Sequence, residues 1–159
     1  MRFLKPILVF AIIQFSSQAA NAQQNDSTSI VSVDPLENLY RYNSPLDYLK
    51  TLKKDFKKKN TFNAFFVTNS PEDWVKEEHI DDLMKLIYST DSTHSVISVF
   101  SSFITHNQFS SIGREAQHLI DCFRDKKSYP PVLNSSGEPN KEHAKELETW
   151  WADYKKKRT

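Results

Sequence analysis

The stretch of sequence that decides the fold is residues 93–106, THSVISVFSSFITH. Its apolar side chains cover more than half of the circumference of a helix, and small serines fill the positions between them. The apolar residues are Val96, Ile97, Val99, Phe100, Phe103 and Ile104, and the serines are Ser95, Ser98, Ser101 and Ser102. A helix of this composition could not keep one face in water. The stretch therefore predicts a central helix that is packed on several sides.

The segments around this stretch have the patterns of amphipathic helices. Residues 46–56, 80–88, 112–123 and 144–154 each place apolar side chains at helical spacing. In the third of these, Gly113 and Ala116 would allow close backbone approach. Ser44, Ser70, Ser111 and Asn140 are predicted N-caps, and Pro45 and Pro71 suit the first helical position. Residues 60–69 indicate either an extended segment or a short helical turn, and residues 132–139 are expected to be a loop.

These patterns predict an all-α fold, either a compact bundle or a short HEAT-like array of five to six helices. The chain has only two glycines, which favours helices joined by capped loops over sheets with many tight turns. With 159 residues, the chain is long enough for one helical domain, expected over residues 44–159. Residues 23–43 open with a polar run and are expected to be a flexible leader.

The first 22 residues have the pattern of a secretory signal peptide. Arg2 and Lys5 precede an apolar run over residues 7–13, and Ala20-Asn21-Ala22 is a small-x-small cleavage site. The run is far shorter than the roughly 20 apolar residues needed to span a membrane. We expect export to the periplasm or the cell exterior, with cleavage near Ala22 and no transmembrane segment in the mature chain.

The balance of charge argues against a nucleic-acid partner. The chain has 21 basic and 20 acidic residues, and loss of Arg2 and Lys5 with the signal would change the net charge from +1 to −1. One helix face is nevertheless rich in lysine, with Lys50, Lys53, Lys54, Lys57 and Lys58. This face could make weak contact with an anionic envelope surface, or it could simply be solvated.

Glu115, His118 and Cys122 are the residues with the greatest chemical potential, because their spacing places them close together on one helix. They could hold a metal or form a thiol-dependent site. However, a structural zinc ion needs four such ligands, and a catalytic cysteine needs a histidine that is oriented by a third group. The alternative is that Cys122 is a small buried apolar residue. We expect no cofactor, no metal site and no catalytic residue.

Trp74, Trp150 and Trp151 are candidate contact residues for a protein partner, together with Lys53, Lys54 and Lys57. Trp150 and Trp151 are adjacent in one helix, so packing of one would leave the other partly exposed, and exposed aromatic residues near cations are typical of contact surfaces. The alternative is that the loop over residues 129–139 covers both indoles.

Three runs, SPEDWVKEEHIDDLMKLI, SSIGREAQHLIDCFRDKKSYPP and ETWWADYKK, resemble small exported helical proteins of unassigned function. The resemblance covers about residues 70–155. It consists of helix caps and packing residues, so it implies a helical fold and carries over no site residue. Periplasmic immunity proteins that neutralise toxins attacking the cell wall are similar in size, export and helical build.

The favoured function is that of an exported non-catalytic helical domain that binds another protein in the periplasm or outside the cell. One alternative is an immunity or inhibitor protein against a toxin or wall hydrolase. The other is a small metal- or thiol-dependent enzyme centred on Glu115, His118 and Cys122.

Overall fold

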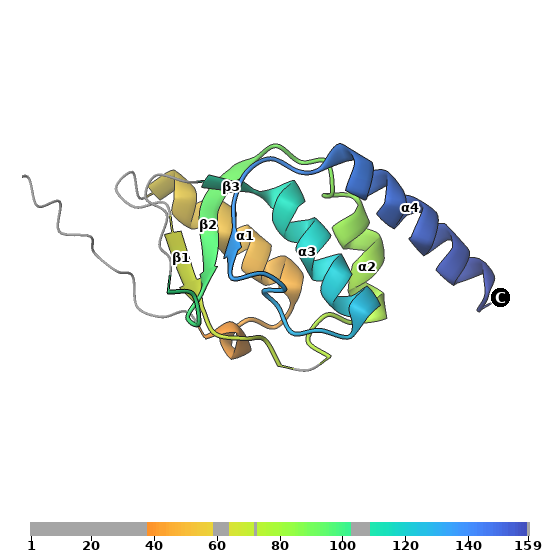
Figure 1. Ribbon diagram of the computed structural model, residues 1–159, viewed down its shortest axis with the longest axis horizontal. Coiled ribbons are helices and arrows are strands. Elements are labelled where there is room, and N and C mark those ends of the chain that lie inside the picture. The colour runs from red at the N-terminus through yellow and green to blue at the C-terminus, as the bar shows by residue number, and fades with distance from the viewer. Residues whose placement is uncertain (1–37, 59–63, 72, 103–108, 159) are drawn as a thin grey trace, which may run out of the picture. The chain divides into compact units, whose positions relative to one another are not determined.

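The computed structural model describes residues 38–58, 64–71, 73–102 and 109–158, all within one compact unit, Val31–Thr159. These residues form four α-helices and a mixed sheet of four strands, with a short 3-10 helix, η1 (Leu39–Arg41), at the start (Figure 1). The prediction of an all-α bundle or HEAT-like array is therefore wrong, because the fold is α/β. The predicted signal peptide and most of the predicted leader lie outside the described residues.

Strand β2 (Ser92–Ser98) is the centre of the sheet and pairs with the other three strands. It runs parallel to β1 (Ala64–Val67), with Phe65 opposite Val96. It runs antiparallel to β3 (Phe109–Ser111) and to β4 (Asn134–Ser135), which pair with different halves of it. The segment predicted as a central helix is therefore a central strand over its first half.

The residues of β2 explain why the prediction of a helix was wrong. Threonine, valine, isoleucine, histidine and serine are all mediocre helix formers, and the β-branched ones among them favour strands. A strand that is buried on both sides reads as an unbroken apolar or small run, which periodicity alone does not distinguish from a buried helix. All residues of β2 after Ser92 are buried. Residues 103–106, at the end of the predicted helix, lie outside the described part.

Three predicted helices are confirmed, together with their caps. Helix α1 (Pro45–Lys58) begins after Ser44, whose hydroxyl accepts a hydrogen bond from the Asp47 N–H at 3.2 Å. Helices α3 (Ile112–Asp125) and α4 (Lys141–Lys156) are capped by Ser111 and Asn140, as predicted. These caps are recognisable in the sequence because each joins residues only two or three positions apart.

Helix α2 (Glu77–Met84) confirms the first half of the helix predicted over residues 80–88, but Ser70 is not its cap. Ser70 instead bonds to a distant segment: its N–H donates to the Tyr129 carbonyl at 2.7 Å, and its hydroxyl accepts from the Tyr129 N–H at 2.9 Å. Asp73 has a left-handed backbone, with φ of 58°, which ends any helix that starts at Pro71. Ser70, Pro71 and residues 73–75 thus belong to a loop, which we call loop 70–75; residue 72 lies outside the described part.

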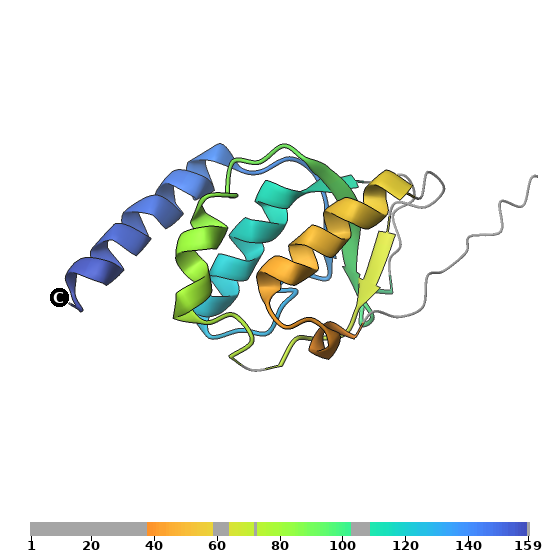
Figure 2. The ribbon, with the colours of Figure 1, turned by 180° about the vertical axis from the view of Figure 1, so that it is seen from behind.

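Helix α3 is the helix packed on several sides that the sequence assigned to residues 93–106. In Figure 1 it lies between α2 and the strands, and Figure 2 shows α1 in front of β1 and β2. Both α1 and α2 contact α3. The buried residues of α3 are Ile112, Gly113, Glu115, Ala116, Gln117, His118, Leu119, Ile120 and Cys122. Three of these residues, Glu115, Gln117 and His118, are polar or charged, and buried groups of this kind need partners inside the protein.

Two residues of α3 hold the neighbouring segments in place. Gly113 lies against the segment after α2, where an added Cβ would come within 2.6 Å of the Ser89 carbonyl oxygen, so the predicted close approach is confirmed. The amide nitrogen of Gln117 donates to the carbonyls of Ile87 and Asn140 at 3.0 and 2.9 Å. Gln117 therefore joins the segment after α2 to the start of α4.

The segment after α3 is only partly the loop that the sequence predicted. It contains β4, and the Gly137 N–H donates to the Phe109 carbonyl at 2.7 Å, which ties this segment to β3 as well. The Tyr129–Pro130 peptide bond is cis. Within the ranges that the structure describes, no helix has the length and apolar character needed to cross a membrane.

Candidate functional site

The Glu115 carboxylate is the centre of a buried polar network. It is fully buried and accepts three hydroxyl hydrogen bonds, from Ser110 at 2.5 Å, from Ser135 at 2.6 Å and from Tyr129 at 2.5 Å. The donors come from β3, β4 and the loop after α3. The network therefore joins the central helix to two strands and a loop through one side chain.

Burial raises the pKa of Glu115 above its ordinary value, because a charged carboxylate loses its hydration in the interior. The three hydroxyl donors and the nearby Arg114 act in the opposite direction, since they favour the charged form. The carboxyl group has no water access in this arrangement, and its acceptor sites are occupied by donors. We therefore interpret Glu115 as a structural centre rather than a catalytic acid.

An aromatic group connects this network to a cavity. The Tyr129 and Tyr48 hydroxyl oxygens are 3.3 Å apart, and the two rings meet edge to face. The Trp74 ring lies 5.8 Å from the Tyr48 ring and 6.2 Å from the Tyr129 ring, measured between centroids. Trp74 therefore packs against Tyr48 and Tyr129 and also lines a cavity.

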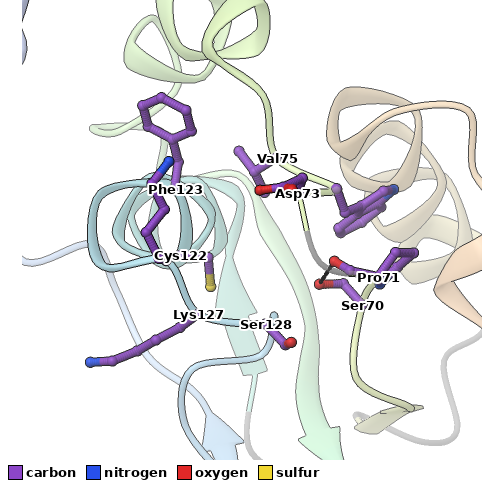
Figure 3. Close-up of a pocket in the computed structure, with 10 residues that line it drawn as sticks. Ser70, Pro71, Asp73, Val75, Cys122, Phe123, Lys127 and Ser128 are labelled. Atoms are coloured by element: carbon purple, nitrogen blue, oxygen red, sulfur yellow. Dashed lines mark hydrogen bonds between the residues drawn. The ribbon is translucent and has the colours of Figure 1, made fainter.

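The cavity lies between loop 70–75 and the C-terminal end of α3 (Figure 3), and its volume is about 300 Å³. It is lined by Ser70, Pro71, Asp73, Trp74, Val75, Cys122, Phe123, Lys126, Lys127 and Ser128. The sulfur of Cys122 faces the space between α3 and the loop, and the Lys127 side chain points away from it. We refer to this space as the α3 cavity.

Burial suppresses the thiol and metal-binding chemistry that was considered for Cys122 and His118. Burial raises the pKa of the Cys122 thiol to about 12, so the reactive thiolate is scarce at neutral pH. Burial also lowers the pKa of His118 to about 4, with the positive charge of Arg114 as the next cause. Within the described ranges, no three His, Cys, Asp or Glu residues form a group that could hold a metal ion.

A second candidate surface lies at the end of the sheet and consists of exposed apolar side chains. Val99 and Phe100 follow β2, and Val132 and Leu133 precede β4. The two segments are neighbours because the Ser98 N–H donates to the Leu133 carbonyl at 2.9 Å. Phe100 is 71% exposed and Leu133 is 57% exposed. We call these four residues the sheet-end patch.

The backbone holds Phe100 outward. The Ser101 N–H donates to the Ser98 carbonyl at 2.9 Å, and the Phe100 N–H donates to the Ser98 hydroxyl at 3.3 Å. These bonds close a turn with Val99 and Phe100 at its two central positions, which glycine, asparagine, aspartate or serine usually occupy. The Phe100 side chain, which is the more exposed of the two, gains little from burial at that place.

The predicted contact tryptophans are in different environments. Trp151 is buried and its indole N–H donates to Asp81 at 2.7 Å, whereas Trp74 and Trp150 are partly buried. Trp150 packs against Phe123 and Trp151. The three tryptophans do not form one exposed surface, and their role in binding stays a prediction.

The predicted contact lysines lie on α1. Lys53 forms an ion pair with Asp91 at 2.5 Å, and Lys54 is exposed. The side chain of Lys57 lies outside the described part. The Lys53 pair joins α1 to the segment before β2, so this lysine has a structural partner besides any surface that it could contact.

Sequence reasoning missed the network around Glu115, the α3 cavity and the sheet-end patch. Glu115 was considered only for its spacing to His118, because its hydroxyl partners on β4 and after α3 are recognisable only once those segments are placed. Phe100 was assigned to the core of the predicted helix. The sequence carries no clear signal for this turn, because Val99 and Phe100 at its central positions are not usual turn residues.

Comparison of the chain with protein families, with curated proteins and with solved structures finds no match.

Proposed function

We propose that this protein is an exported, non-catalytic domain that binds another protein through the sheet-end patch. The observation that carries the proposal is the exposure of Phe100 and Leu133 on two segments that a backbone hydrogen bond joins. Surface apolar residues that occur singly need no explanation, whereas neighbouring ones rimmed by polar residues are typical of protein interaction sites.

The chemistry of the patch suits a protein partner. The aromatic ring of Phe100 can enter an apolar pocket on the partner, and aromatic residues are enriched at interface centres. Serines surround it on its own segment, at positions 98, 101 and 102. Since the turn is closed before any partner arrives, little conformational entropy is lost on binding.

Export is the second part of the proposal and rests on the pattern of residues 2–22. Expression in the native cell should give a chain that begins at Gln23, which N-terminal sequencing of the protein from the envelope and the medium would establish. An uncleaved chain in the cytoplasm would contradict export, and the search for a partner would then move to that compartment.

The binding test is a comparison of three tagged chains expressed at equal levels in the native cell. The wild type and Tyr88→Ser should capture the same partner in stoichiometric amount, and the double variant Phe100→Ser, Leu133→Ser should lose it. Tyr88 is a suitable control because it is also an exposed aromatic residue, but it precedes β2 whereas Phe100 follows it. Equal capture by the double variant and by Tyr88→Ser would contradict the assignment of the patch.

A further inference from the structure

The α3 cavity has charges of opposite sign that are not paired with each other. Asp73 is on loop 70–75, and Lys126 follows the C-terminal end of α3. Neither side chain forms a hydrogen bond or ion pair with any residue that the structure describes; the Lys126 ammonium lies 4.8 Å from the centroid of the Phe123 ring. An anion and a cation that line one cavity without pairing with each other are suited to a ligand that carries both charges.

The backbone at these two residues supports the same conclusion. Asp73 has a φ of 58° and Lys126 a φ of 54°, and within the described ranges they are the two non-glycine residues with positive φ. This left-handed conformation costs lysine more than aspartate, which adopts it more readily than most residues, and glycine is the usual residue after a helix end. Such backbone positions gather at functional sites, where the side chain is needed despite its cost. Here both of them line one cavity.

Hydrogen bonds within the protein hold the described residues of both cavity walls. Loop 70–75 is held by the paired hydrogen bonds between Ser70 and Tyr129 and by the bond from the Trp74 N–H to the Pro71 carbonyl at 3.3 Å. The Lys127 N–H donates to the Cys122 carbonyl at 3.0 Å, which closes the end of α3. A site held in this way needs little reorganisation on binding.

Size and lining restrict the class of ligand. The volume of about 300 Å³ is at the lower end of the usual range for small-molecule sites, about 300–1,000 Å³. Val75, Cys122 and Phe123 offer apolar contacts, and Ser70 and Ser128 supply hydroxyl groups. Such a site fits a compact molecule with a short apolar part between or beside its charges.

We propose that the α3 cavity binds a small zwitterion, a free α-amino acid or a dipeptide, with its ammonium group at Asp73 and its carboxylate at Lys126. This site is separate from the sheet-end patch, and the two proposals can fail independently. The side chain of the ligand would lie against Val75 and Phe123. Removal of either charge of the ligand, by N-acetylation or by amidation, should weaken binding in the same way as removal of its partner on the protein.

The test is calorimetric titration of the purified chain with a pool of the twenty common α-amino acids and, separately, with a pool of dipeptides. Trp74 lines the cavity, so a change in tryptophan fluorescence provides a second measurement of the same event. Asp73→Asn and Lys126→Gln should each raise the Kd of the bound zwitterion by about tenfold or more, the effect of losing one charged hydrogen-bond partner. Asparagine tolerates the left-handed conformation, so Asp73→Asn should fold normally.

Two further variants separate binding from folding. Lys127→Gln removes the same charge one residue away, but Lys127 points out of the cavity and pairs with Asp125 at 3.3 Å. Its Kd should stay within about twofold of the wild type. Lys126→Gly should raise the melting temperature, because glycine suits the positive φ, and should still lose binding.

The proposal is overturned if neither pool binds at about 10 mM, a concentration well above the Kd of any useful site. It is also overturned if Lys126→Gln and Lys127→Gln weaken binding equally, since this would indicate a general charge effect. Equal binding of the N-acetylated or amidated ligand would exclude recognition of a zwitterion. Binding of dipeptides alone, or of free amino acids alone, would decide between the two sources of this chemistry.

Discussion

The Glu115 network and the sheet-end patch are opposite exceptions to the usual distribution of side chains. In the network, a carboxyl group and three hydroxyl groups are buried, and each makes a short hydrogen bond. In the patch, four apolar side chains are exposed at the end of a sheet whose central strand is otherwise buried. A buried polar group is tolerated when its partners are inside the same chain, whereas an exposed apolar group has no partner there.

The network therefore serves the fold, whereas the patch is the candidate surface for contact with another molecule. The Glu115 network stabilises the fold only as a complete set, because loss of one member leaves the others buried and unpaired. The patch contributes little to the fold, and the proposed contact with another molecule would remove its side chains from water. Four measurements test this contrast.

The largest expected effect is that of Glu115→Ala. Three buried hydroxyl groups would lose their acceptor, which should lower the free energy of unfolding by about 4 kcal/mol. Urea denaturation followed by circular dichroism measures this change. Glu115→Gln is the matched control, because its amide oxygen can still accept from one or two of the hydroxyls, and it should cost less than half as much. A loss of less than about 1 kcal/mol for Glu115→Ala would mean that the network is not structural.

The next effect depends on pH and concerns His118. Burial lowers its pKa from 6.5 to about 4, so the unfolded chain binds a proton between these values and the folded chain does not. Stability should therefore be complete above pH 6.5 and fall as the pH decreases toward 4, by about 3 kcal/mol in total.

The variant His118→Gln provides the reference for this pH effect, because glutamine does not titrate. The difference in free energy of unfolding between the wild type and His118→Gln should shrink as the pH falls through this window. A constant difference from pH 7 to pH 4 would indicate that His118 titrates normally and is open to water.

A smaller effect is expected for Gly113→Ala, which tests how tightly the helix around the network is packed. The new Cβ would come within 2.6 Å of the Ser89 carbonyl oxygen and 2.8 Å of the Ser89 nitrogen, both backbone atoms. Overpacking of this kind should lower the free energy of unfolding by about 2 kcal/mol, although alanine is the better helix former. A stabilised variant in thermal denaturation would show that α3 and the segment after α2 can move apart.

The smallest effect is expected at the sheet-end patch. Phe100→Ser and Leu133→Ser should each change the free energy of unfolding by no more than about 0.5 kcal/mol, as is usual at the surface. Val96→Ser, on β2 four residues before Phe100 and fully buried, is the contrasting variant and should cost about 3 kcal/mol. A large loss of stability for Phe100→Ser would place that ring in the core and remove the main support for protein binding.

Prediction from the sequence succeeded where the signal was local. Ser44, Ser111 and Asn140 mark the starts of α1, α3 and α4, because a cap bonds to the backbone two or three residues ahead. The same signal failed at Ser70, whose hydroxyl bonds to Tyr129, 59 residues away. Cap residues are therefore reliable only if no distant segment competes for the same hydroxyl.

Prediction failed more seriously at β2, where the composition suited either a buried helix or a buried strand. Two of its pairing partners are β1, about 30 residues earlier, and β4, about 40 residues later. The sequence left β1 open between an extended segment and a helical turn, and it predicted a loop at β4. The candidate site followed the same pattern. The sequence singled out Glu115, His118 and Cys122 on one helix, but the partners of Glu115 and the charged walls of the cavity come from other segments.

The sequence by itself determined three of the helices, the close approach at Gly113 and the burial of the α3 stripe, because each depends on spacing within a few residues. Only the tertiary structure decided that residues 92–98 form a strand, that Glu115 joins β3, β4 and Tyr129, and that Phe100 lies outside. Each of these depends on contacts between segments that are distant in the chain. The physical reason is that a strand or a buried carboxyl group is stable only when its hydrogen-bond partners are supplied, and a helix with its caps supplies its own.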